Sequence, residues 1–306
     1  TCWTLHYLPG TTTYADTPIV QIAAFVGNGN VQTDCDCADK TPKVFSVTGP
    51  GNVGPFIADT DTSRQLTITS VGSVQVPDPN AIRTEGNLGA MITRDFGFGS
   101  ALGEVTIGGI PLENIAWANE VITGNVPLTA PTGQLVVKRA DSGVSSLNSV
   151  TVTVGNAGIP NVRTVAQGQS IQAALDAAVP GDLILVQPGS YYEMLIMTKP
   201  VKLQGWGAGS THIIVSQSLA TQLQTWREKM NELVNCPLTQ AGKVALLPGQ
   251  ANNTLLATGP CGFQVGTGLF QVDEGAGIFI GAQDGVFTSG QHGRVDGFSV
   301  AGSVTS

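Results

Sequence analysis

A succession of short apolar segments constrains the fold of this chain more than any other feature of its sequence. The segments fall at residues 183–186, 195–196, 199–205 and 213–215, and bends of only a few residues separate them. Parallel strands joined by helical crossovers need about a dozen residues for each connection, and these intervals are shorter. A solenoid of parallel strands, in which each turn stacks on the preceding turn and hydrogen-bonds to it, fits both the strand lengths and the spacing.

A short helix is predicted just before these segments. Ser170 is a suitable N-cap residue, and Ile171, Ala174, Leu175 and Ala178 follow at the spacing of one helical face. The Pro-Gly-Asp sequence at residues 180–182 should end the helix. We therefore expect a helix with one apolar face directed at the solenoid core.

Residues 170–193 read S-I-Q-A-A-L-D-A-A-V-P-G-D-L-I-L-V-Q-P-G-S-Y-Y-E. This phrase closely resembles the N-terminal cap and first coil of right-handed parallel β-helix proteins of the pectate-lyase-like superfamily. The resemblance implies a β-helix over residues 159–306. Coil-like strands resume at residues 277–280 and 294–300. No terminal polar cap follows them, so we expect this β-helix to be incomplete.

The coil pattern is interrupted by an insertion at about residues 216–272. Within it, residues 219–234 have the spacing of an amphipathic helix, and its apolar face is formed by Leu219, Leu223, Trp226, Met230 and Leu233.

The preceding region, residues 81–158, has strand-like segments about ten residues apart with glycine turns between them, which is typical of a β-sandwich. The order G-F-G, V-x-I-G-G, W, I-x-x-x-V-P and G-x-L-V-V resembles the IPT/TIG family of immunoglobulin-like domains. That resemblance implies a spacer or binding module, usually without catalysis. Residues 1–80 are expected to form a separate small β module, with strands at 19–26, 44–47 and 66–69. The expected fold class is all-β: immunoglobulin-like β modules plus a partial right-handed parallel β-helix with a helical insertion.

Charge and hydropathy exclude several classes of protein. The formal net charge is −8, and the 14 Lys and Arg residues are scattered, so no basic surface for nucleic acid is expected. No apolar run reaches the roughly 18 residues needed to span a bilayer. The sequence begins at Thr1 without Met or a leader-like segment, and we interpret it as a mature or excised piece of a longer precursor.

The five cysteines fall into an N-terminal and a C-terminal group. We expect Cys236 to pair with Cys261, and Cys2 to pair with either Cys35 or Cys37. Disulfides form in oxidising compartments, so this pattern favours a secreted or cell-surface location. The odd number leaves one thiol free or paired outside the chain.

The densest group of possible metal ligands is Asp34, Asp36 and Asp39, which lie beside Cys35 and Cys37. A calcium loop would need more oxygen ligands and a distal bidentate carboxylate, and a zinc site would need two further ligands. We therefore favour a structural turn with a disulfide. No cofactor is expected, and Ca²⁺ is the alternative.

Resemblance to polysaccharide-degrading β-helix enzymes directs attention to carboxylates and aromatic residues. Asp273 and Glu274 form the only adjacent pair of carboxylates in the coil region and are the candidate catalytic residues. Trp206, Tyr191 and Tyr192 could stack on sugars, although aromatic residues at coil corners more commonly pack against insertions.

Together these observations favour a non-catalytic extracellular or cell-surface scaffold or binding protein. Its expected partners are a glycan, a surface protein or a second copy of itself, through end-to-end or edge-strand association. One alternative is a fragment of a carbohydrate-active β-helix enzyme, either a polysaccharide lyase or a hydrolase. The other is the tail of a larger metal- or redox-handling surface protein.

Overall fold

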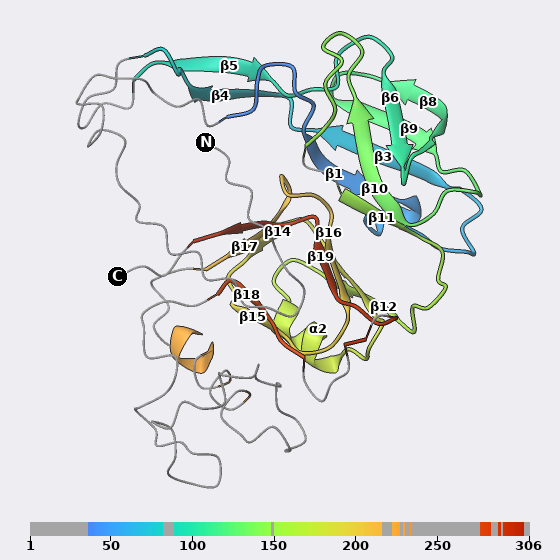
Figure 1. Ribbon diagram of the computed structural model, residues 1–306, viewed down its shortest axis with the longest axis vertical. Helices are drawn as coiled ribbons and strands as arrows, with labels where there is room; N and C mark the ends of the chain where they lie inside the picture. Colours follow the sequence, from blue (N-terminus) through green and yellow to red (C-terminus); the bar gives the residue numbers. More distant parts are fainter. Residues whose placement is uncertain are drawn as a thin grey trace, which may run out of the picture. The chain divides into compact units, whose positions relative to one another are not determined.

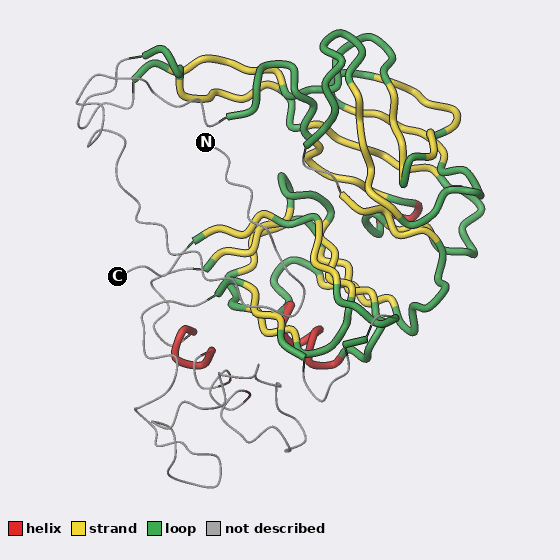
Figure 2. The backbone as a smooth tube through the Cα atoms, in the orientation of Figure 1, coloured by secondary structure: helices red, strands yellow, loops and turns green. Residues whose placement is uncertain are grey.

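The computed structural model describes residues 36–81, 89–147, 150–215, 222–226, 229, 233, 276–282, 287–288 and 290–302. Strands make up most of the regular structure in these ranges (Figures 1 and 2), so the all-β class expected from the sequence is confirmed. No helix within the described ranges has the length and apolar character needed to cross a membrane.

The chain divides into two compact units. The first comprises residues 1–37 and 75–93. Its described part is centred on a two-stranded sheet of β4 (Ser73–Pro77) and β5 (Met91–Asp95). Gln75 Nε2 donates to Thr93 Oγ1 at 2.6 Å, and the Asp78 amide donates to the Ala90 carbonyl at 2.9 Å.

The second unit, residues 38–74 and 94–306, begins with two facing sheets. The four-stranded sheet has the order β1 (Val44–Thr48), β3 (Gln65–Ser70), β9 (Val121–Asn125) and β8 (Glu113–Trp117). The five-stranded sheet has the order β2 (Phe56–Ile57), β11 (Val150–Val154), β10 (Gly133–Lys138), β6 (Glu104–Ile107) and β7 (Ile110–Pro111). Pairing is antiparallel except between β2 and β11. We call these two sheets, with the short 3₁₀ helix η1 (Pro50–Asn52), the two-sheet module.

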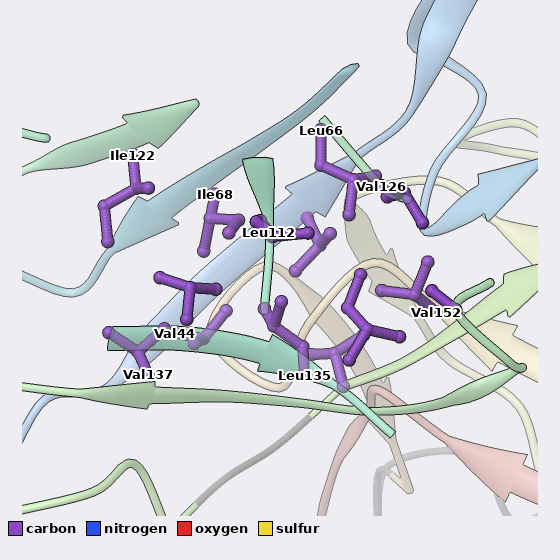
Figure 3. Close-up of a cluster of buried hydrophobic side chains, with 14 of the residues drawn as sticks. Val44, Leu66, Ile68, Leu112, Ile122, Val126, Leu135, Val137 and Val152 are labelled. Carbon is purple, nitrogen blue, oxygen red and sulfur yellow. The ribbon is translucent and has the colours of Figure 1, made fainter. Parts of the chain in front are cut away.

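The core of this module lies between the sheets (Figure 3). Leu66 and Ile68 come from one sheet, Leu135 and Val137 come from the other, and all four are fully buried. The alternation of side chains along β3 explains how one strand contributes to this core. Buried positions alternate with exposed or half-buried positions along the strand. Such alternation places one face of a strand on a core and leaves the other toward solvent.

The module boundary expected near residue 80 does not match the pairing of the strands. β3 pairs with β9 along five residue pairs, and β2 pairs with β11. Strands from both sides of residue 80 therefore share one core. The apolar alternation of the early strands shows that they need a partner sheet, but not which later segment supplies it.

The remainder of the unit, residues 156–302, winds through three sheets of parallel strands that enclose a common core (Figure 1). We call it the parallel module. The first sheet has the order β12 (Val162–Val165), β13 (Leu183–Val186), β16 (Lys202–Gly205) and β19 (Arg294–Asp296). The second contains β14 (Gly189–Tyr191), β17 (Thr211–Ile214) and β20 (Ser299–Ala301), and the third contains β15 (Leu195–Met197) and β18 (Ile278–Ile280).

Helix α2 (Ile171–Ala177) packs onto the beginning of this core. Ser170 Oγ accepts a hydrogen bond from the Ala173 amide, and Ile171, Leu175 and Ala178 are buried. The predicted cap and the predicted apolar face are both confirmed.

Successive turns of the chain stack their inward side chains in register. Met197 pairs with Ile280, and Ile213 pairs with Val300. Met197 and Ile213 are almost fully buried, whereas Ile280 and Val300 are 51% and 50% exposed. The last described strands therefore cover the inward side chains beneath them but leave their own half exposed.

The helix expected at residues 219–234 is described only at residues 222–226, 229 and 233, all of which are helical. Leu223 and Trp226 are buried against Met194, Ile196 and Val215. Leu219 and Met230 lie outside the described residues.

Candidate functional site: the outer face of the first parallel sheet

The outer face of the first parallel sheet carries two columns of side chains. Because Leu203 points into the core and side chains alternate along a strand, its neighbours Lys202 and Gln204 point outward. Register then places Arg294 beside Lys202 and Asp296 beside Gln204 on the same face. The sheet thus presents a column of cations next to a column of uncharged and acidic groups.

This face packs against the two-sheet module. Leu183 and Leu185 of β13 are buried with Phe56, Ala58 and Ile159. These apolar contacts form one half of an interface that we call the joint.

Polar contacts form the other half of the joint. Asp296 Oδ2 accepts a hydrogen bond from the Thr151 amide at 2.7 Å. Arg294 donates to Thr153 Oγ1 at 2.9 Å and to Gln204 Oε1 at 3.0 Å. Hydrogen bonds that involve charged groups are stronger and more directional than neutral ones. The bonds from Asp296 and Arg294 to Thr151 and Thr153 therefore hold the first parallel sheet in one position on strand β11.

Trp206 closes one edge of the joint. Its carbonyl accepts a hydrogen bond from the Val47 amide at 2.8 Å, and its side chain is only 5% exposed. A Cβ atom added at Gly54 would lie 2.5 Å from Trp206 Nε1, so the indole packs directly on that glycine. Trp206 is therefore part of the joint rather than of an open sugar-stacking surface.

The cation column has few compensating contacts. Both acceptors of Arg294 are neutral, and its buried Nε finds no hydrogen-bond partner in the part of the chain that the structure describes. The ammonium group of Lys202 has no hydrogen bond or ion pair within the described ranges. Burial, and then the positive charge of Arg294, lower the pKa of Lys202 below its usual value. Burial lowers the pKa of Arg294, and Asp296 partly offsets that effect.

A pocket of about 660 Å³ opens beside Lys202. Its walls come from the segment that links the two modules, from turns of the parallel module and from a later loop: residues 156–160, Pro180, Gly181, Pro200, Lys202 and residues 290–292. Pro200 is buried and Lys202 is half-buried, whereas Gln291 and His292 are exposed at the rim. Among the described residues, the lining includes Lys202, His292 and two residues with side-chain amides, Asn156 and Gln291, and it includes no Asp or Glu.

Carboxylates elsewhere in the parallel module hold the backbone in place. Asp182 is fully buried and accepts hydrogen bonds from Asn161, Arg163 and the Val179 amide. Burial alone would raise the pKa of Asp182, but these donors outweigh it and the pKa is lowered. Glu193 accepts from Ser170 Oγ and from the amides of residues 171 and 172 at the start of α2.

A second charged cluster surrounds Arg139 in the two-sheet module. This guanidinium is buried and binds Asp141 at 2.6 Å and Asp95 at 2.8 Å. Burial would raise the pKa of Asp95, but the Gly97 amide and Arg139 lower it overall. Asp39, one of the proposed metal ligands, accepts the Asp95 amide at 2.7 Å. That carboxylate therefore has a structural role in tying residues 39 and 95 together.

The other sequence-based candidates are placed only in part. Tyr191 is buried and its hydroxyl donates to the Gln187 carbonyl at 2.9 Å, whereas Tyr192 is 55% exposed. Asp36 and Cys37 are described, and no group of three or more possible metal ligands gathers within the described ranges. The remaining candidates lie outside the described residues: Cys2, Asp34, Cys35, Cys236, Cys261, Asp273 and Glu274.

A smaller pocket, of about 380 Å³, lies between α2 and the helical residues 222–226. Glu193, Ile196 and Trp226 contribute to its lining. The side chain of Gln222 donates to the Tyr192 carbonyl at its edge. This contact attaches the helical residues 222–226 to the turn that carries Tyr192.

No protein-family model matches the sequence, and no characterised protein matches it with significant similarity.

Proposed function

We propose that this chain is a non-catalytic scaffold of an extracellular or cell surface, in which an immunoglobulin-like module of the IPT/TIG type is joined rigidly to the opening coils of a right-handed parallel β-helix. The observation that carries the proposal is the joint. Interfaces between modules of one chain commonly permit relative motion unless they are large and apolar. Here apolar packing by Leu183 and Leu185 is combined with directional bonds to Asp296 and Arg294.

The joint also determines which surfaces remain available to a partner. The outer face of the first parallel sheet is engaged by strand β11 at Asp296 and Arg294, so it cannot serve as an open groove along the coils. The exposed ring of Tyr192 lies on another corner of the parallel module. We assign contacts with a glycan or a surface protein to that corner, because an exposed aromatic ring can stack on either.

A measurement of the distance between the two modules tests the rigid joint. Spin labels would be placed at Leu128, which is 87% exposed, and at exposed Ser190. They would be attached through azide-bearing amino acids so that the cysteines remain untouched. Pulsed electron spin resonance should then give one narrow distance distribution.

Variants of the joint make the test specific. Asp296→Ala and Trp206→Ala should broaden the distribution, because each removes a contact that holds the modules together. Asp176→Ala, at an exposed position on α2, is the matched control and should leave the distribution unchanged. A broad distribution in the unaltered protein would contradict the proposal.

A further experiment separates the scaffold from the enzyme alternative. Incubation with polygalacturonate or alginate, with and without Ca²⁺, should release no unsaturated uronides. Release that disappears in Asp273→Asn or Glu274→Gln would favour a lyase instead.

A further inference from the structure

We propose that the pocket beside Lys202 binds the oxyanion group, a carboxylate or a phosphate, of a small molecule. The inference starts from an imbalance of charge. Lys202 and Arg294 are register partners on adjacent parallel strands, which lie about 4.8 Å apart. Cations at neighbouring register positions repel each other, and partial burial strengthens the repulsion because less water screens it.

The described surroundings do not neutralise this pair. Arg294 donates to a hydroxyl and to an amide oxygen, and Lys202 receives no acceptor from the described residues. Asp296, in the adjacent column of this face, offsets the charge of Arg294 only in part and directs Oδ2 to the Thr151 amide. The chain as a whole has 22 acidic residues against 14 basic ones, so the isolation of these cations is not caused by a lack of acids. Both cations are half-buried, and charges that are partly withdrawn from water are normally paired, which points to an anion from outside the chain.

The pocket has the composition that such an anion requires. Lys202 supplies a charge at its half-buried wall, and Gln291, His292 and the side-chain amide of Asn156 supply donors at its rim. Asn156 Oδ1 already accepts the Asp59 amide at 3.0 Å, which leaves its amide nitrogen able to donate. Pro180, Pro200 and Ile159 provide apolar walls for the rest of a small molecule. Ligand pockets commonly combine mostly apolar walls with a few convergent polar groups.

The test is a titration of the full chain with acetate and, separately, with inorganic phosphate. Ionic strength would be held constant with chloride so that general screening does not change. Calorimetry and the nuclear magnetic resonance shifts of the Gly158, Gly181 and Gly290 amides would report binding at the pocket. We expect saturable binding of at least one of the two anions, with shifts confined to these amides and their neighbours.

Substitutions identify the residue responsible. Lys202→Gln should weaken binding about tenfold or more because it removes the charge-assisted hydrogen bond. Lys202→Arg should retain binding. Lys138→Gln, at an exposed lysine of β10, is the matched control and should bind as the unaltered protein does. Because Lys202→Gln also removes the repulsion from Arg294, it should fold and melt no earlier than the unaltered protein.

The outcome is decisive in either direction. Saturable binding that is lost in Lys202→Gln and kept in Lys202→Arg supports the site for whichever anion shows it. The proposal is overturned if neither anion saturates, or if Lys202→Gln and Lys138→Gln have the same effect. The rigidity of the joint is measured separately, so failure here leaves that proposal intact.

Discussion

Replacing Asp182 by Asn should destabilise the parallel module by about 2–3 kcal/mol. The carboxylate is fully buried, with one oxygen accepting from Arg163 at 2.8 Å and from the Val179 amide at 3.1 Å. The other oxygen accepts from Asn161 Nδ2 at 2.8 Å. An asparagine can direct its oxygen at the first two donors, but its NH₂ group then faces the NH₂ group of Asn161.

The magnitude follows from those contacts. The substitution loses one hydrogen bond, worth about 1 kcal/mol, and weakens a charge-assisted one by a similar amount. Leaving a buried donor unsatisfied adds about 1 kcal/mol or more. Breaking a fully buried ion pair costs about 3–5 kcal/mol. The Arg163 side chain is 35% exposed, so water recovers part of that loss.

Urea unfolding monitored by tryptophan fluorescence would measure the change, because Trp206 and Trp226 both lie in the parallel module. Asp176→Asn is the control, since Asp176 is exposed and, among the described residues, its carboxylate contacts the side chains of Gln172 and Lys229. It should change stability by less than about 0.5 kcal/mol.

The dependence on pH provides a second check of the same reasoning. The pKa of Asp182 is lowered below its ordinary value of 3.8, so the ionised carboxylate stabilises the folded state. That stabilisation is fully present above the unfolded pKa and is lost as pH falls through the folded pKa. The difference between the unaltered protein and Asp182→Asn should therefore be constant near neutral pH and shrink below about pH 4. Equal effects of the two substitutions, or a difference that grows in acid, would refute the argument.

Two further substitutions probe the joint and the cap of α2. Gly54→Ala should destabilise the chain by about 1–3 kcal/mol more than Gly51→Ala. Both glycines have positive φ, but of the two only Gly54 packs on Trp206. Equal melting temperatures of the two variants would show that the indole can move aside. Glu193→Ala should cost about 1–2 kcal/mol by removing the acceptor of three donors around the start of α2. In the same thermal melts, exposed Glu120→Ala should have almost no effect, and a similar loss in both variants would contradict the capping role.

Local signals in the sequence were sufficient for much of the parallel module. The Ser170 cap, the apolar face of α2 and the strand at residues 183–186 depend on neighbouring residues, and the structure has all three. Strand β14 was not predicted, because its three residues lie among turn-forming ones and show no periodicity. Short strands of this kind are defined by the strand on which they stack, here β17.

The candidate site could not be predicted in the same way. Lys202 and Arg294 lie on strands separated by a long insertion, and only the register of β16 with β19 brings them together. A weak signal was present, since each residue precedes an inward apolar side chain, Leu203 or Val295. Aligning Leu203 of one strand with Val295 of the other would have placed Lys202 beside Arg294. The hydrogen bonds of Asp296 and Arg294 to strand β11 depend on how the two folded modules pack together. The periodicity of the sequence carries no information about that packing.

The two ends of the parallel core are covered differently. At its beginning, Ile171 and Leu175 of α2 pack on the core and cover that end. At the last described strands, Ile280 and Val300 remain half exposed. A further turn of parallel strands could therefore pack on the end formed by β18 and β20, whereas α2 covers the opposite end. A second copy could meet those strands tail to tail, which closes a two-fold pair, whereas head-to-tail growth into a filament would require α2 to be displaced in every subunit.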